Sequence, residues 1–212
     1  MKKLLGILIG LCVAVSALAQ TAEQILTKMD EQMTQHESEG VIMTVETKIP
    51  IIGTIRMKSY MLGDKLRMET TMMGADLIIW DDGITEYTYN SKDNEITIDK
   101  GAGSSSEDSG DLDMFSGITD GYTVSIKKET ADAWYILCKK NKDNVNKEDP
   151  KNMDVVVAKG TYYPVSLSAK IDGVTMIMKD ISFGVTQEQM TFDLSKYPDA
   201  KIIDKRNEPK KK

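Results

Sequence analysis

The chain has 212 residues, of which 41% are hydrophobic and 28% charged, and its 33 Asp and Glu outnumber its 27 Lys and Arg. This length is enough for one domain with its own hydrophobic core. The resulting net charge of −6 excludes nucleic acid as the expected partner.

Residues 1–19 predict a secretory signal peptide. Lys2 and Lys3 precede an apolar run from Leu4 to Val15, and Ala17-Leu18-Ala19 supplies the small residues of a cleavage site. The apolar run is shorter than the roughly 18–20 residues that span a bilayer, which disfavours the alternative of an uncleaved anchor. Cleavage after Ala19 predicts a periplasmic protein, and the loss of the two lysines changes its net charge from −6 to −8.

Neither of the two cysteines can form an internal disulfide after export. Cys12 lies within the signal peptide and leaves with it, so Cys138 remains alone. A lone cysteine in a strand is usually a small buried apolar residue. We therefore expect a monomer whose core provides all of its stability.

One amphipathic helix is predicted, from Thr21 to His36. Thr21 and Gln24, three residues apart, form a capping box at its start. A single apolar stripe runs along it, formed by Ala22, Ile25, Leu26, Met29 and Met33. Such a stripe must be buried, and the strands that follow are the large partner available.

Alternating apolar and polar residues predict a series of strands from Val41 onward. Gly63-Asp64, Asp82-Gly83 and Lys92-Asp93-Asn94 provide turns within the first half, and Lys159-Gly160 and Asp172-Gly173 within the second half. Few helical patterns interrupt about ten or eleven strands. The pattern predicts a mainly β (α+β) fold with a highly curved antiparallel sheet or an open barrel.

Residues 101–110, GAGSSSEDSG, predict a mobile loop between the two halves. The acidic residues in and after it do not follow the spacing of a calcium-binding loop, so no metal site is expected. The next segment, Asp111–Phe115, predicts one short helical turn. We expect a lid over the concave face of the sheet, formed by Ile25, Met29, Leu112, Met114 and Phe115.

The two-residue period of a strand places Ile55, Met57 and Met61 on one face, whereas Arg56, Lys58 and Arg67 face solvent. The chain contains 14 methionines and only three phenylalanines. Methionine fills ordinary cores, but many on one surface also suit flexible apolar ligands. The predicted lining of an apolar cavity is Met43, Val45, Ile55, Met57, Met61, Leu66, Met68, Leu77, Ile79, Met176 and Met178.

No catalytic constellation is recognisable, and we predict a protein that is not an enzyme and needs no cofactor. His36 is the one histidine, at the polar end of the predicted helix, where a surface role is expected. The sequence has no phosphate loop, dinucleotide fingerprint or G-x-S-x-G motif. A hydrolase with an unrecognised site remains an alternative, and it requires polar groups that converge in a pocket.

The order of these elements resembles the outer-membrane lipoprotein carrier family, the LolA type of a superfamily of periplasmic lipid-binding proteins. Trp80–Asn90, WDDGITEYTYN, is similar to a hairpin of the family, and Phe192–Asp204 is similar to its closing segment. The resemblance implies an open, incomplete β-barrel over residues 20–204 with helices as a lid. It also implies that the interior holds the acyl chains of a lipoprotein or lipid, with transfer partners in the inner and outer membranes.

The chain departs from the best-known carriers in one motif. Their Arg-Pro pair, in which the arginine helps to hold the lid shut, is replaced by Lys58-Ser59-Tyr60, so no residue here takes that role. An envelope sensor or protein-interaction module on the same fold is the alternative function. It predicts an interior filled by side chains. Residues 205–212 lack apolar anchors and predict a disordered basic tail.

Overall fold

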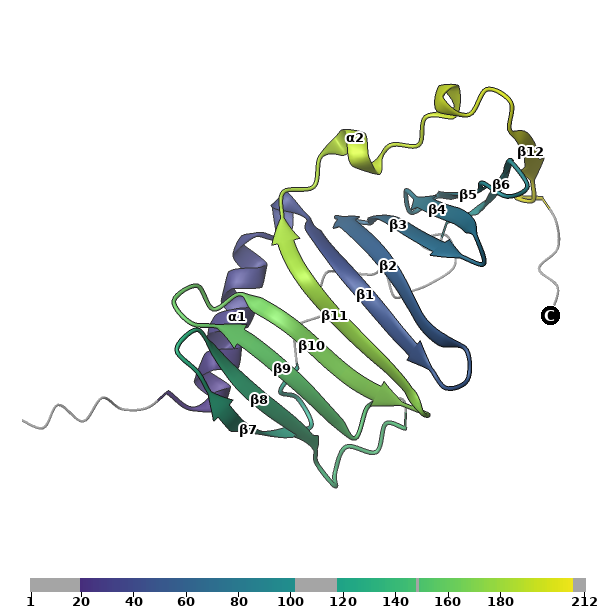
Figure 1. Cartoon of the computed structure of the whole chain (residues 1–212). Coiled ribbons are helices and arrows are strands. Elements are labelled where there is room, and N and C mark those ends of the chain that lie inside the picture. Colours follow the sequence, from purple (N-terminus) through teal and green to yellow (C-terminus); the bar gives the residue numbers. More distant parts are fainter. Residues whose placement is uncertain (1–19, 102–117, 148, 208–212) are drawn as a thin grey trace, which may run out of the picture.

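Figure 1 shows the computed structural model, which describes residues 20–101, 118–147 and 149–207. The predicted signal peptide, the predicted lid residues Leu112, Met114 and Phe115, and residues 208–212 of the predicted tail lie outside the described residues. Within the described residues, no helix is both long and apolar enough to cross a membrane.

Twelve strands of the described residues form one sheet, in the order β12-β6-β5-β4-β3-β2-β1-β11-β10-β9-β8-β7. The strands of the first half are β1 (Val41–Ile49), β2 (Gly53–Leu62), β3 (Lys65–Met72), β4 (Ala75–Asp81), β5 (Thr85–Asn90) and β6 (Glu95–Lys100). Those of the second half are β7 (Tyr122–Glu129), β8 (Ala133–Lys140), β9 (Asn152–Ala158), β10 (Pro164–Ile171), β11 (Val174–Phe183) and β12 (Lys201–Asp204).

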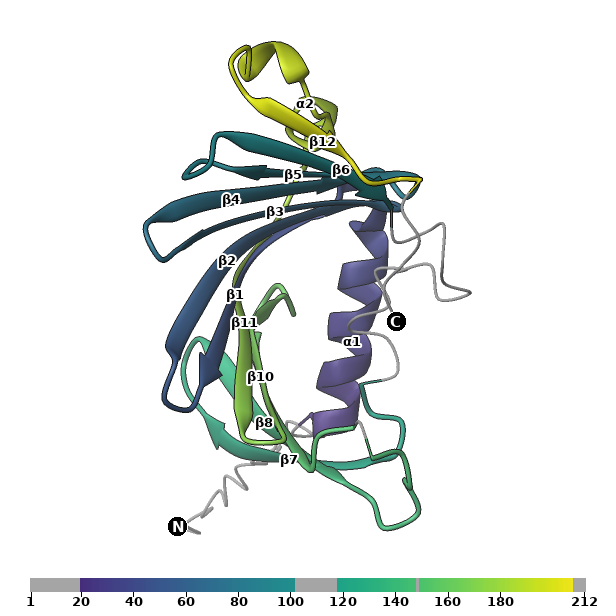
Figure 2. The same ribbon diagram turned by 90° about the vertical axis from the view of Figure 1, so that its right-hand side faces the viewer.

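The sheet is open, with β7 and β12 as its edges, and it curves strongly (Figure 2). The predicted mainly β, incomplete-barrel architecture is confirmed. The strand beyond the expected ten or eleven is β12, which pairs parallel to β6, whereas the other neighbouring strands pair antiparallel. The pairing extends past the predicted start of the tail, because the Lys205 N–H donates to the Ile98 carbonyl at 2.8 Å.

The predicted helix forms as α1 (Ala22–Gln35), with Thr21 as its N-cap and the predicted capping box to Gln24. It lies on the concave side of the sheet, beside β7–β10 (Figures 1 and 2). Its stripe packs into the main core, together with residues of β1 and β7–β10. Cys138 on β8 is buried in this core as expected, and burial raises the pKa of its thiol to about 11.

His36 is half-buried rather than at the surface, because it joins the end of α1 to β11 and to the residue before β10. Its ring stacks on Phe183 at a centroid distance of 4.6 Å. Its Nε2 lies 2.7 Å from the Tyr163 hydroxyl and its Nδ1 lies 2.7 Å from Glu39 Oε1. Both ring nitrogens therefore have partners, and the residue fixes the end of the helix instead of facing solvent.

The C-terminal segment covers the convex face of β3–β6. It contains α2 (Gln187–Met190) and η3 (Leu194–Lys196) before β12. Phe192 stacks on Tyr87 with a centroid distance of 4.2 Å and contacts the edge of Trp80. The ring of Tyr197 is tilted against that of Tyr89, with a centroid distance of 4.4 Å. Aromatic contacts thus hold this segment on the sheet.

The prediction that Arg67 faces solvent is wrong, because this segment covers it. Its side chain is 20% exposed. The guanidinium donates to the Gln189 carbonyl at 2.8 Å, pairs with Glu69, and lies over the rings of Tyr60 and Trp80. The two-residue period correctly gives the face of the sheet, but not that a distant segment lies on it.

A buried carboxylate joins β1, β2 and β11 on the convex face. Glu46 accepts hydrogen bonds from Lys179 Nζ at 2.8 Å and Arg56 Nε at 2.7 Å, and its side chain is 7% exposed. The Lys179 ammonium and the Arg56 guanidinium lower the pKa of this carboxyl from 4.5 to about 2. Arg56 faces this side of the sheet as predicted, yet its charge is paired.

Glu46→Gln is expected to make stability less dependent on pH. A lowered folded-state pKa contributes stability that is complete above the unfolded-state value near 4.5 and is lost as the pH falls to about 2. The difference in unfolding free energy between wild type and Glu46→Gln should therefore be largest above about pH 5 and shrink on acidification. Urea unfolding across this range measures it, and a difference that stays constant with pH would contradict the assignment.

Ile25→Ala tests the packing of α1. Ile25 is 0% exposed in the main core, so its truncation leaves a cavity. We expect the unfolding free energy to fall by about 2–5 kcal/mol. Ile84, in the β4–β5 turn, is 76% exposed, and Ile84→Ala should change the unfolding free energy by less than about 0.5 kcal/mol. Equal effects of the two changes would show that α1 is not part of the core.

Candidate functional site

The strand register brings all of the predicted cavity-lining residues to the concave face. Val45 on β1 pairs with Met57 on β2, Met57 with Thr70, and Thr70 with Leu77 on β4. A second row runs from Met43 through Ser59 and Met68 to Ile79. On the other side of β1, Val45 pairs with Met178 and Thr47 with Met176. Paired residues share a face, so these side chains lie on the side that α1 occupies.

These residues nevertheless lie in different surroundings. Met43 and Val45 are buried in the main core with α1, and so are the predicted lid residues Ile25 and Met29. Met57, Met61 and Met178 are half-buried at the margin of this core. Under α1 the concave face is therefore filled by side chains, and the four core residues occupy its interior rather than an opening.

The part of the concave face on β3 and β4 lies outside the main core. Four predicted lining residues lie there, Leu66 and Met68 on β3 and Leu77 and Ile79 on β4, and all four are half-buried. Neither of the two buried hydrophobic clusters of the described residues includes them. We call these four residues the apolar band. Ile55 on β2, also half-buried, faces the same side.

Acidic residues lie next to the apolar band on the concave face of the sheet. The register continues from Leu66 to Asp81 on β4, then to Glu86 on β5 and Asp99 on β6. Burial is the main cause that raises the pKa of Glu86, and the nearby Asp81 and Asp99 carboxyls raise it further. Thr88, which pairs with Ile79, donates to Glu86 at 3.3 Å. The face thus changes from apolar to acidic between β4 and β6.

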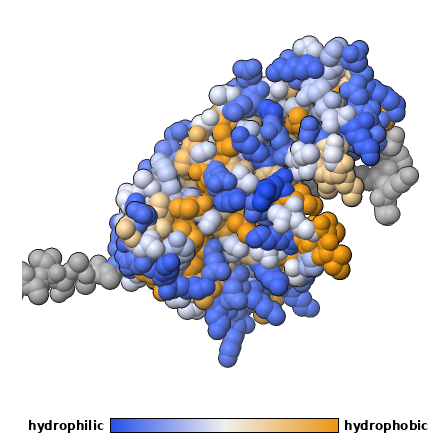
Figure 3. Space-filling model, viewed as in Figure 1, coloured by the Kyte–Doolittle hydropathy of each residue, from blue (hydrophilic) through white to orange (hydrophobic). Residues whose placement is uncertain are grey.

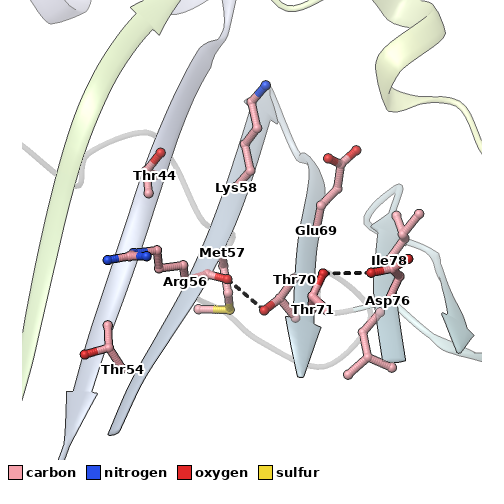
Figure 4. Close-up of a pocket in the computed structure, with 11 residues that line it drawn as sticks. Thr44, Thr54, Arg56, Met57, Lys58, Glu69, Thr70, Thr71, Asp76 and Ile78 are labelled. Carbon is pink, nitrogen blue, oxygen red and sulfur yellow. Dashed lines mark hydrogen bonds between the residues drawn. The ribbon is translucent and has the colours of Figure 1, made fainter. Parts of the chain in front are cut away.

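A polar hollow adjoins the apolar band at Leu77, where β2 and β3 diverge. It has a volume of about 630 Å³ and is lined by Thr44, Thr54, Arg56, Met57, Lys58, Glu69, Thr70, Thr71, Asp76, Leu77 and Ile78 (Figure 4). The Thr70 hydroxyl donates to the Arg56 carbonyl at 2.7 Å, and the Thr71 hydroxyl donates to Asp76 at 2.7 Å. Most of these residues are polar, and the charges of Arg56 and Lys58 balance those of Glu69 and Asp76. Such a lining does not suit an acyl chain.

The residues that most often take part in metal or nucleophilic chemistry have other surroundings in the described part of the chain. Among them, no group of three or more His, Cys, Asp or Glu is placed to hold a metal ion. Cys138 is buried with a raised pKa, and the nitrogens of His36 are bonded to Tyr163 and Glu39. The distinctive feature of the face is its apolar band beside acidic groups.

Sequence alone could predict which face of the sheet these residues occupy, but not how many of them α1 covers. Strand periodicity gives the side of the sheet for every lining residue, whereas the boundary between core and band depends on where one helix lies. The acidic border was missed as well. Glu86, Asp81 and Asp99 come together only through the pairing of β4, β5 and β6.

No protein-family model matches the chain, and no curated protein matches its sequence. Solved structures do resemble it. An uncharacterised conserved protein from Thermus thermophilus is 13% identical with a TM-score of 0.48, over 86% of this chain and 98% of that one. A LolA superfamily protein from Nitrosomonas europaea is 13% identical with a TM-score of 0.30, over 82% of this chain and 99% of that one.

A third solved structure is the MucA/MucB complex of Pseudomonas aeruginosa. It matches with 8% identity and a TM-score of 0.41, over 79% of this chain but only 61% of that chain. The solved structures that resemble the chain thus include a LolA superfamily protein and a protein solved with a protein partner. At this level of similarity the neighbours do not distinguish a lipid carrier from a protein-interaction module. The distinction has to come from the chemistry of the concave face.

Proposed function

We propose that this protein is an exported carrier or chaperone that holds acyl chains of lipoproteins or related lipids on its concave face. The cargo would be delivered toward the outer membrane. The observation that carries the proposal is the apolar band, whose four side chains are half-buried and lie outside the main core. Signal-peptide cleavage and a periplasmic location are part of the same proposal.

The energy available to such a site is sufficient for binding. Each methylene buried from water contributes roughly 0.8 kcal/mol, so about ten methylenes of one acyl chain would gain on the order of 8 kcal/mol before binding costs. Leucine, isoleucine and methionine provide apolar contact without fixing the shape of a ligand. The acidic border at Glu86 and Asp99 would lie beside the polar part of an amphipathic ligand rather than beside its chain.

A second candidate function, a sensor or protein-interaction module, is favoured by one observation. Part of the concave face is filled, because Ile25, Met29 and Met43 belong to the main core instead of lining an opening. A protein that only binds a partner on its outside needs no open apolar face. The two candidates therefore differ over whether the apolar band takes up an acyl chain.

The variants Ile79→Gln and Ile78→Gln distinguish the two candidate functions. Both replace an isoleucine of β4, but the two side chains lie on opposite faces of the sheet. With a fluorescent palmitoyl lipopeptide as probe, Ile79→Gln should bind about 5- to 150-fold more weakly, since an amide on the band has no partner in an acyl chain. Ile78→Gln, beside the polar hollow, should bind like wild type. Fluorescence titration measures both affinities.

Circular dichroism and urea unfolding must first show that both variants fold. Equal affinities of wild type and folded Ile79→Gln would remove the apolar band from the site. If the wild type binds no acyl probe at all, the carrier proposal fails and the interaction module becomes the better one.

A further inference from the structure

Exposed apolar side chains gather at one end of the sheet. The strands β1, β3, β8 and β10 all end there, so the turns that follow them lie at the same end. Seven of the twelve large apolar residues that are exposed among those described lie at this end: Ile51, Ile52, Met72, Met73, Val145, Ile171 and Met176. We call this end the apolar rim. Figure 3 shows strongly hydrophobic colour at its right-hand edge, over the β1–β2 turn.

The β1–β2 turn is the most exposed part of the rim, and its backbone is strained. Ile51 is fully exposed and Ile52 is 71% exposed. The Ile52 N–H donates to the Pro50 carbonyl at 2.9 Å, and Ile51 between them has a φ of 72°. A β-branched residue is disfavoured in this left-handed region, where glycine is at ease. Neither packing nor turn geometry accounts for two isoleucines here. We therefore look for their role in an interaction with another molecule rather than in the stability of the domain.

Basic side chains accompany the apolar ones. Lys48 lies two residues before the turn. Lys170, on β10, lies two strands away at the same end, because both lysines pair with Thr175 of the intervening β11. Both are exposed. A hollow of about 300 Å³ at this end is lined by Lys147, Asp149, Pro150, Lys151, Lys170, Ile171, Asp172 and Gly173, with three lysines against two aspartates. Lysines thus outnumber aspartates by one around this hollow, in a chain that is acidic overall.

We propose that the apolar rim docks reversibly on the surface of a lipid bilayer that contains anionic lipids. Ile51 and Ile52 enter the boundary between headgroups and acyl chains, and Lys48 and Lys170 meet the lipid phosphates. Protruding apolar turns flanked by lysines fit such an interface, because each side chain reaches its own depth and the charges stay in the headgroup layer. This inference goes beyond the proposed function and does not depend on it.

A bilayer is favoured over a second copy of the chain by the shape of the rim. The apolar residues stand on separate turns with the polar hollow between the β1–β2 and β3–β4 turns, so they do not form one continuous flat face. Stable protein interfaces need closely packed, complementary surfaces. A fluid lipid surface has no such requirement.

The test uses the full exported chain and vesicles of phosphatidylethanolamine and phosphatidylglycerol in a flotation assay. The double variant Ile51→Gly with Ile52→Ser should bind the vesicles about tenfold more weakly or worse, because its apolar anchor is lost. Ile84→Ser, which removes a similarly exposed isoleucine at the opposite end, should bind like wild type. Added salt should weaken vesicle binding by the wild type. The same salt should weaken binding by the double variant Lys48→Gln with Lys170→Gln to a smaller extent.

Loss of vesicle binding in the double variant does not come from unfolding if its midpoint of thermal unfolding is maintained. Ile51→Gly alone should raise that midpoint by about 2–4 °C, because it relieves the strained backbone. The inference is overturned if wild type does not float with the vesicles, or if the double variant floats equally well. It is also overturned if wild type forms a dimer in solution that the double variant abolishes. Binding of the acyl probe should be unchanged in the double variant, which separates this test from that of the carrier proposal.

Discussion

Among the described residues, one long helix, α1, covers the concave face of a sheet that is much wider than itself, and the rest of the structure follows from this constraint. The 14 residues of α1 extend about 21 Å. Twelve strands at about 4.8 Å spacing make a sheet roughly 53 Å across. Curvature brings β1 and β7–β10 around the helix, which gives the main core. The strands β3–β6 lie beyond it and obtain their cover on the other face, from the aromatic residues of the C-terminal segment.

This unequal cover explains why chemically similar residues have different roles. Met43 and Met68 face the same side, two strands apart, yet Met43 is buried beneath α1 and Met68 remains half-buried. An apolar surface left partly exposed costs solvation free energy unless a ligand covers it. The acidic residues beside the band set the limit of that surface at β5 and β6. On this view the core stabilises the domain, and the band provides binding.

Much of the fold could be predicted because local signals agree with it. The Thr21–Gln24 capping box, the stripe of α1 and the turns between strands all have the form that the sequence predicts. What could not be predicted depends on contacts between distant segments. Arg67 looks like a surface residue until Gln189 lies over it, and the four residues of β12 have too short a pattern to be recognised before they pair with β6. The boundary of the apolar band depends on the position of α1 in the same way.

Photo-crosslinking with an acyl chain that carries a diazirine tests the central claim most directly, because mass spectrometry then locates the residues that the chain touches. The account predicts adducts on Leu66, Met68, Leu77 and Ile79, and none on residues buried under α1 such as Val155. Adducts confined to the polar residues of the hollow, such as Thr71 and Asp76, or to the turn at Ile51, would contradict it.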